Sequence, residues 1–227
     1  RKILFSSECM NDCIGGVILY DETINQTSSF GKSIPKLISD SGAVPGIKVD
    51  TGAKDLANSS EEKVTEGLDG LRDRLKKYYK LGARFTKWRG VYSISEKYPT
   101  KLALNSNAHA LARYSALVQE SGMVPIVEPE VLMDGEHSID VCLSKTSEVI
   151  EKCFEELILH KVDISGIILK PNMILPGNQS IEQISSEEVS NKTLECLKNS
   201  VPRDVPGIAF LSGGQSELEA TENLNLI

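Results

Sequence analysis

The sequence predicts an α/β fold, a (β/α)8 barrel of which about six β/α units lie in this chain. Short apolar runs alternate with helix-like segments, and this alternation indicates a parallel sheet covered by helices. The starts of successive runs lie 29, 40, 39, 43 and 41 residues apart, which is the regularity expected of a repeated strand–helix unit. The runs begin at Gly15, Val44, Arg84, Met123, Gly166 and Gly207.

A doubly wound open sheet is the alternative, because it uses the same alternation of strands and helices. The regular spacing favours the barrel, and so do the charged residues that end several runs, since active sites of barrels lie at the carboxyl ends of their strands. The 227 residues begin at Arg1 without a methionine and end at Ile227 inside a predicted helix. We therefore expect residues 1–227 to form one domain, an internal segment of a longer protein that is incomplete at both ends.

Capping boxes and apolar stripes predict the helices between the runs. In a capping box a Ser side chain bonds the amide three residues later, and a Glu at that position bonds back. The predicted boxes are Ser59 with Glu62, Ser185 with Glu188 and Ser216 with Glu219. Apolar residues at helical spacing predict two more helices, over residues 107–120 before Gly122 and from about Ile139 to His160.

The overall charge and hydropathy exclude broad classes of partner. A formal net charge of −7 argues against a nucleic-acid surface and against an anionic membrane surface. No apolar stretch approaches the roughly 20 residues that a membrane helix needs. A small anionic substrate remains compatible with this charge if the basic residues gather in one place.

Cysteine and histidine usage points to a cytoplasmic protein without a metal site. An odd number of cysteines without the spacing of a disulfide framework favours a reducing compartment. Neither Cys9 nor Cys13 has a nearby histidine or second cysteine pair, so a zinc site there is not expected. The histidines, His109, His137 and His160, lie far apart in the sequence with no ligand-like spacing.

Charged residues gather near the ends of four successive runs. Residues i and i+2 of a strand share a face, and three runs carry a charged pair at that spacing. The charged residues are Lys48, Asp50, Lys87, Arg89, Glu128, Glu130 and Lys170. A single lysine or glutamate at a strand end is more often a solvated rim residue, and an internal network of ion pairs is a structural alternative. Their recurrence on four strands favours a functional site at one mouth of the barrel.

Such a mouth can support Schiff-base chemistry. A lysine among other cations loses part of its preference for the protonated form, and its neutral amine can attack a carbonyl. Lys170 and Lys87 are both candidates for this nucleophile, and Glu128 for the proton transfers. Lys170 is favoured, because it ends the apolar run GIILK and Pro171 stops the strand directly after it.

A glycine-rich segment follows the last run. Ser212, Gly213 and Gly214 can bring backbone N–H groups close to a phosphate just before a predicted helix. In barrels a phosphate site often follows strand 7 or 8. A plain glycine-rich turn is the alternative interpretation.

The motifs GGVILY, VPGIKVD, FTKWR, VPIVEPE, LKPNM and FLSGGQSE, in this order, closely resemble class I fructose-bisphosphate aldolase. The resemblance extends from about Cys13 to Ile227. It implies a (β/α)8 TIM barrel that works without a metal, and we expect no cofactor. It also implies a homotetramer when the protein is full length, and a phosphorylated sugar as the substrate.

The resemblance also implies roles for individual residues. Lys170 would form the Schiff base with the substrate ketone, Glu128 would be the main acid–base residue with Glu130 beside it, and Lys87 would stabilise intermediates. Lys48 and Arg89 would bind the phosphate distant from the ketone, whereas Ser212, Gly213 and Gly214 would hold the near one. The implied reaction is the reversible cleavage of fructose 1,6-bisphosphate to dihydroxyacetone phosphate and glyceraldehyde 3-phosphate.

The chain departs from the family mainly in extent. The family's first strand with an aspartate, its last strand with an arginine and its tyrosine-bearing tail are expected outside residues 1–227, so the segment alone is expected to be inactive and prone to aggregation. Thr86 stands where the family usually has alanine and should point away from the site, as should Trp88. The functional alternatives are another Schiff-base enzyme, such as a transaldolase, and a non-catalytic barrel scaffold.

Overall fold

The computed structural model describes residue 5 and residues 10–29, 31–59 and 61–227, so Cys9 lies outside the described residues. The helices are α2 (Met10–Cys13), α3 (Asp21–Ile24), α4 (Ile34–Asp40), α5 (Leu71–Leu81), α6 (Lys101–Glu120), α7 (Ile139–Leu159), the 3-10 turn Ile164–Gly166, α8 (Ser186–Ser200) and α9 (Glu217–Leu226). The strands are β1 (Gly16–Leu19), β2 (Val44–Lys48), β3 (Gly52–Asp55), β4 (Lys63–Glu66), β5 (Phe85–Tyr92), β6 (Val124–Val131) and β7 (Ile168–Leu169).

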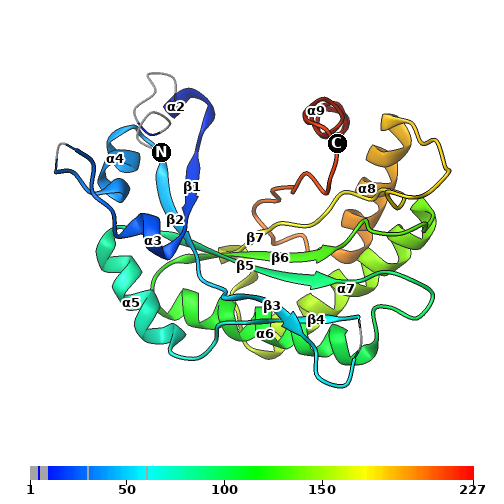
Figure 1. The fold of residues 1–227 in the computed structure, drawn as a ribbon, viewed down its shortest axis with the longest axis horizontal. Coiled ribbons are helices and arrows are strands. Elements are labelled where there is room, and N and C mark those ends of the chain that lie inside the picture. The colour runs from blue at the N-terminus through cyan, green and yellow to red at the C-terminus, as the bar shows by residue number, and fades with distance from the viewer. Residues whose placement is uncertain (1–4, 6–9, 30, 60) are drawn as a thin grey trace.

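Among the described residues, five strands form one parallel sheet in the order β1-β2-β5-β6-β7. Helices α5, α6 and α7 lie along one face of β5 and β6, and α9 lies on the opposite side (Figure 1). The predicted α/β class with a parallel sheet is therefore confirmed. Because β1 and β7 are the two edges, the described sheet is an open arc of a barrel.

The outward face of the sheet carries the apolar core. Ile47, Trp88, Val127 and Leu169 alternate with the inward-facing charged residues, and each is 0% exposed. The ring of Trp88 packs against Tyr114 of α6, with the ring centroids 5.4 Å apart. The prediction that Trp88 points toward the helices is confirmed.

The sixth apolar run forms no strand of its own within the described residues, which corrects the expectation of six strands. It contributes a parallel bridge between Leu169 and Ile208, with the amide of Ala209 2.9 Å from the carbonyl of Leu169. Its partner β7 is only two residues long. Pro171 follows that strand closely and has no N–H to donate, so the ladder between the two runs stops early.

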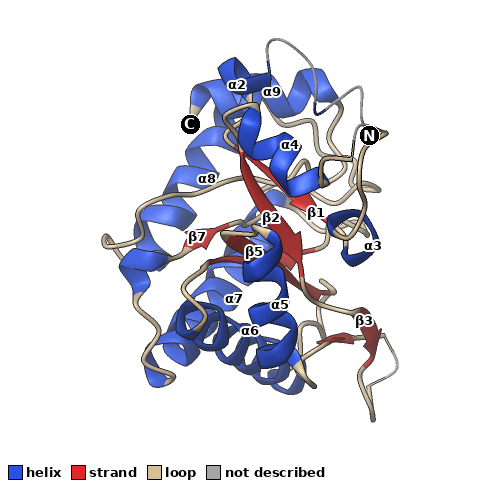
Figure 2. Ribbon diagram, turned by 90° about the vertical axis from the view of Figure 1, so that its left-hand side faces the viewer, coloured by secondary structure: helices blue, strands red, loops and turns tan. Residues whose placement is uncertain are grey.

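The helix start predicted at Ser59 is wrong. Residues 63–66 form β4, which pairs with β3 in an antiparallel hairpin set apart from the main sheet (Figure 2). Glu62 is buried and accepts hydrogen bonds from the amide and hydroxyl of Thr100, at 2.7 and 2.6 Å, so it supports the start of α6 instead. Helix α5 begins at Leu71, after Gly70 with a φ of 63°. Tertiary contacts therefore override the local capping pattern.

The predicted ends of α6 and α7 are confirmed, but α6 begins at Lys101, six residues before its predicted start. Helix α6 ends at Glu120, just before Gly122, and α7 spans Ile139–Leu159 with His160 at its C-cap. The side chains of Ser185 and Ser216 cap α8 and α9, and the second forms the full capping box with Glu219. Within the described part of the chain, none of the helices combines the length and apolar character needed to cross a lipid bilayer.

Candidate active site

The strand register stacks the inward-facing residues in layers. Lys48 pairs with Lys87, Lys87 with Ile126, and Ile126 with Ile168, so these four residues form one layer across four strands. The next layer toward the carboxyl ends contains Arg89 opposite Glu128. Lys170 belongs to this second layer, because its amide bonds the carbonyl of Val127 at 2.8 Å. The predicted gathering of strand-end charges is confirmed.

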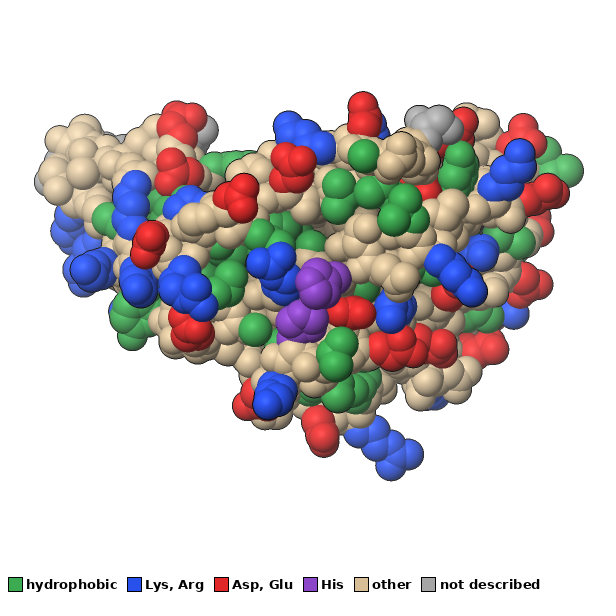
Figure 3. Space-filling view, turned by 90° about the horizontal axis from the view of Figure 1, so that it is seen from below, with side chains coloured by type: hydrophobic (Ala, Val, Ile, Leu, Met, Phe, Trp, Pro, Cys, Tyr) green, Lys and Arg blue, Asp and Glu red, His purple; other side chains and the backbone are tan. Residues whose placement is uncertain are grey.

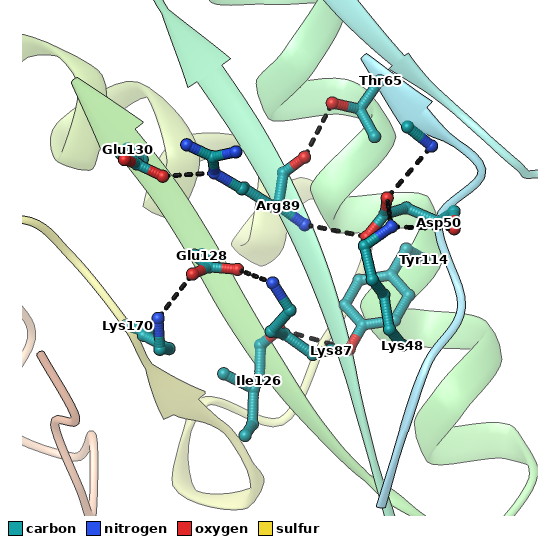
Figure 4. A network of polar contacts seen from close by, with 11 residues as sticks. Lys48, Asp50, Thr65, Lys87, Arg89, Tyr114, Ile126, Glu128, Glu130 and Lys170 are labelled. Atoms are coloured by element: carbon teal, nitrogen blue, oxygen red, sulfur yellow. Dashed lines mark hydrogen bonds and ion pairs between the residues drawn. The ribbon is translucent and has the colours of Figure 1, made fainter. Parts of the chain in front are cut away.

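Glu128 lies at the centre of this arrangement. Its side chain is 3% exposed, and its two carboxylate oxygens accept hydrogen bonds from different lysines, as Figure 4 shows. Lys170 Nζ lies 2.5 Å from Oε1, and Lys87 Nζ contacts Oε2 from the layer below. The side chains of Lys87 and Lys170 are 14% and 19% exposed, so both are in limited contact with water. One carboxylate therefore lies within proton-transfer distance of both candidate nucleophiles.

A second ion-pair group lies beside the first. Lys48 contacts the carboxylate of Asp50, and the amide of Arg89 donates to the same side chain at 3.4 Å. The guanidinium of Arg89 reaches up to Glu130 in the next layer, and this hydrogen bond raises the pKa of Arg89. Asp50 was grouped with the strand-end charges through its i+2 spacing from Lys48, but no catalytic or binding role was predicted for it. At 2% side-chain exposure it holds the ammonium of Lys48 and accepts the backbone amides of Arg89 and Gly52.

Buried polar contacts hold the strands in this register. The Thr86 hydroxyl lies 2.7 Å from the hydroxyl of Tyr114, which also donates to the carbonyl of Ile126 at 3.2 Å. Burial raises the pKa of Tyr114 well above its usual value, so it stays a neutral donor. Thr86 thus points away from the site, as predicted. At the far end, Asn172 accepts the amide of Val131 at 3.0 Å and secures β6 just after Glu130.

The glycine-rich segment forms a turn at the same end of the sheet. The amide of Leu211 lies 3.4 Å from the carbonyl of Pro171, which places Ser212 beside the residues that follow Lys170. Gly213 and Gly214 have φ values of 56° and 80°, and the turn closes when the amide of Gln215 bonds Ser212. This turn thus lies beside Lys87, Glu128 and Lys170, which we call the lysine centre. Among the described residues, no hydrogen bond joins Ser212, Gly213 or Gly214 to it.

A cavity lies to one side of Lys87, Glu128 and Lys170. It has a volume of about 820 Å³ and is lined by Lys48 and Asp50, by β4 and the loop after it, and by parts of α5 and α6. Lys170 and Glu128 do not line it, because they face the open inner side of the arc. A smaller hollow of about 450 Å³, lined by Phe85, Ile126 and Ile168, forms the apolar floor beneath them.

The acidic groups of the site are already occupied by cations. Lysines contact Asp50 and Glu128, and Arg89 contacts Glu130, so the arrangement suits an amine nucleophile with an adjacent proton carrier. Side chains that could hold a metal come together elsewhere, on the outer face of α6 and α7. There His109 and His160, which lie far apart in the sequence, have ring centroids 4.8 Å apart.

Comparison with known proteins shows which family the chain resembles. A family model described as fructose-bisphosphate aldolase class-I matches residues 1–227. A probable fructose-bisphosphate aldolase class 1 of Xylella fastidiosa strain 9a5c is 49% identical over 225 residues, which is 99% of this chain and 67% of that protein. The fructose-bisphosphate aldolase 6, cytosolic, of Arabidopsis thaliana is 48% identical over 99% of this chain and 63% of its own length.

A solved structure of similar fold supports the same assignment. The fructose-bisphosphate aldolase of Plasmodium falciparum superposes with a TM-score of 0.97 at 43% sequence identity, covering 100% of this chain and 66% of that one. The chain thus spans about two thirds of the length of these relatives. The five-stranded arc of the described residues is therefore part of a TIM-type barrel. By sequence and by fold, the chain belongs to the class I fructose-bisphosphate aldolase family.

Proposed function

We propose that the protein containing this chain is a metal-independent lyase that reversibly cleaves fructose 1,6-bisphosphate to dihydroxyacetone phosphate and glyceraldehyde 3-phosphate. The observation that carries the proposal is the Glu128 carboxylate held between Lys87 and Lys170 at the carboxyl end of a parallel sheet. That combination gives a nucleophilic amine and a proton carrier in direct contact. It fits the family to which the chain belongs.

The first step joins the substrate to Lys170. The neutral amine attacks the C2 ketone and forms a C–N bond, and the resulting carbinolamine loses water to give an iminium ion. Glu128, 2.5 Å from Lys170 Nζ, takes the proton that leaves the nitrogen and returns one to the departing hydroxyl. Lys87 contacts the other carboxylate oxygen and steadies its charge while the proton moves.

The second step breaks the carbon–carbon bond. A base removes the proton of the C4 hydroxyl, the C3–C4 bond breaks, and its electron pair moves into the iminium to give an enamine. Glyceraldehyde 3-phosphate leaves at this point. Protonation of C3 restores the iminium, and one water hydrolyses it to dihydroxyacetone phosphate and the free amine of Lys170.

The flanking groups bind the two phosphates. Lys48 and Arg89 lie to one side of the lysine centre, and Arg89, at 42% side-chain exposure, is the more open cation. In this proposal they hold the phosphate distant from the ketone. The turn Ser212–Gly214 lies beside the strand of Lys170, and its backbone amides can hold the phosphate next to the ketone.

Borohydride trapping of the full-length protein with dihydroxyacetone phosphate tests the mechanism. Reduction of the iminium leaves a stable adduct, which peptide mass mapping locates. We expect the adduct on Lys170 and none on Lys48, which serves as an internal control because it also lies on this face. Lys170→Met should abolish trapping.

The other outcomes separate the alternatives. An adduct on Lys87 alone keeps the reaction class but exchanges the two lysines. No adduct in a folded protein overturns the mechanism and favours a non-catalytic scaffold. Competition between fructose 1,6-bisphosphate and other phosphorylated sugars distinguishes this reaction from that of a transaldolase or of another Schiff-base aldolase.

We further infer that the full-length protein works in the cytoplasm as a homotetramer and that residues 1–227 belong to one barrel domain. Relatives in Arabidopsis thaliana are described as cytosolic, which supports the compartment. The tetramer follows from the family resemblance. Sedimentation equilibrium of the full-length protein tests the oligomeric state, and a monomer at micromolar concentration would contradict it.

A further inference from the structure

A second cluster of titratable side chains lies on the outer face of the molecule, where α6 packs on α7. His109 comes from α6, whereas Glu156 and His160 come from α7 and its C-cap. One ligand atom of each residue lies within 4.8 Å of the others. Figure 3 shows histidine side chains next to each other on this face, with acidic and basic side chains around them. His109 also lines the cavity beside Lys48 and Asp50, whereas Glu156 and His160 do not.

The local sequence explains why the three side chains meet. Glu156 and His160 are four residues apart, so they lie on the same face of α7. Packing of α6 on α7 then brings His109 over both of them. The rings of His109 and His160 are nearly perpendicular, with an angle of 72° between their planes.

Hydrogen bonds assign the lone pair of one histidine. Nδ1 of His160 lies 2.8 Å from the backbone carbonyl oxygen of Glu156. A carbonyl only accepts, so this nitrogen carries the proton and Nε2 keeps the lone pair that a metal needs. Backbone carbonyls commonly hold metal-binding histidines in this way. Nδ1 of His109 lies 3.2 Å from Oε2 of Glu156, so that ring also directs a nitrogen into the cluster.

The carboxylate is placed to serve both histidines. Glu156 is 13% exposed at its side chain, and its Oε2 lies 3.7 Å from Nδ1 of His160. The neighbouring Lys152 approaches the other oxygen, Oε1, at 3.5 Å, so it leaves Oε2 to the imidazoles. His109 is 52% exposed, which gives an ion in solution direct access.

We propose that His109, Glu156 and His160 form a binding site for one divalent transition-metal ion of the zinc type. Two imidazole nitrogens and one carboxylate oxygen are a common donor set for zinc, with a fourth position open to water. Ligand atoms around a tetrahedral zinc lie about 3.3 Å apart. The separation of 3.2 Å between Nδ1 of His109 and Oε2 of Glu156 is close to this value, and rotation of the exposed His109 ring adjusts its position relative to His160.

Titration of the full-length protein with zinc and cobalt chlorides tests the proposal. The protein carries Cys13→Ser, because an exposed thiol is a ligand for zinc and cobalt and would add a competing signal, and it is first stripped with a chelator. Calorimetry should show one zinc ion per chain, and cobalt should give the visible absorption of a tetrahedral site. His109→Ala and His160→Ala should each weaken binding at least about tenfold.

Matched variants separate ligation from a change in surface charge. Glu156→Gln should lose affinity, whereas Glu155→Gln, on the same helix and with a side chain 68% exposed, should bind as the parent does. His109→Cys keeps a ligand at that position and should retain the cobalt spectrum with a thiolate band. Zinc should also raise the melting temperature of the parent but not that of His109→Ala. Absence of binding by the parent, or unchanged affinity in His109→Ala, overturns the site and leaves a metal-free hydrogen-bonded cluster.

Discussion

Replacement of Glu128 by glutamine is predicted to damage both stability and activity. The amide can accept a hydrogen bond from one lysine, but its NH2 group then faces the second lysine, so one cation is left without a partner. Each charge-assisted hydrogen bond contributes about 1.5–3 kcal/mol. The lysines are 14% and 19% exposed, and water recovers part of that loss. We expect the free energy of unfolding to fall by about 3 kcal/mol, because a buried pair broken on one side is costly.

Glu130→Gln is the matched control for this substitution. Glu130 contacts a single cation, Arg89, whose side chain is 42% exposed, so its loss should cost only about 1 kcal/mol. Addition of Lys87→Met to Glu128→Gln should recover part of the lost stability, because it removes one of the competing cations.

Urea unfolding of the full-length protein measures these differences, and a thermal scan should show the Glu128→Gln midpoint lowered by about 6–12 °C. Turnover of fructose 1,6-bisphosphate should fall at least about 100-fold through loss of the proton carrier. Equal losses of stability in Glu128→Gln and Glu130→Gln would refute the idea that one carboxylate holds both lysines.

Three further predictions concern the reactivity of a buried thiol, the pH dependence of stability at a histidine, and the cost of a side chain at a glycine in a turn. Burial raises the pKa of Cys153 to about 12, so alkylation at about pH 8 should modify exposed Cys13 and reach Cys153 only on unfolding, as peptide mass mapping would reveal; labelling of Cys153 in the folded protein would contradict this. Burial also lowers the pKa of His137 below its ordinary 6.5. The stability that depends on a neutral His137 is therefore fully present above the unfolded pKa of 6.5 and is lost as the pH falls from there through the lower folded pKa. Urea unfolding at about pH 7.5 and 5.5 should therefore show a smaller change in the free energy of unfolding for His137→Gln than for the parent protein. The same change in both proteins would contradict this reasoning. Gly214 has a φ of 80° and an added Cβ would lie 2.4 Å from a methionine sulfur, so Gly214→Ala should cost about 1–2 kcal/mol in urea unfolding, whereas Gly207→Ala, whose Cβ meets nothing within 4 Å, should cost less than half of that.

Local patterns succeeded where one element decides the outcome. The i, i+2 pairs on three runs share a face because side chains alternate along a strand, and the structure places them together. The capping residues Ser185 and Ser216 begin helices because both partners of each cap lie within one turn. Both predictions depend on neighbours in the sequence alone.

Local patterns failed where a distant residue competes for the same group. Ser59 and Glu62 have the spacing of a capping box, and the Ser59 hydroxyl donates to Glu62 at 2.9 Å. Glu62 also bonds Thr100, however, 38 residues away, and the chain after it becomes β4. Asn107 of α6 completes this arrangement by accepting the amide of Thr65 at 3.1 Å. A buried carboxylate and a buried amide need several partners, and the fold supplies Thr100 and Thr65 from distant parts of the chain.

The sequence by itself determined the class of fold, the order of its strands along the chain and the residue types that end them, because hydrophobic periodicity and strand alternation act over a few residues. It also carried the motifs by which the family is recognised. Only the tertiary structure decided which charges meet. Glu128 joins lysines that are 41 and 42 residues away, and His109 meets Glu156 across 47 residues. Such contacts depend on strand register and on how α6 packs against α7, since side chains this far apart along the chain come together only when the whole core is assembled.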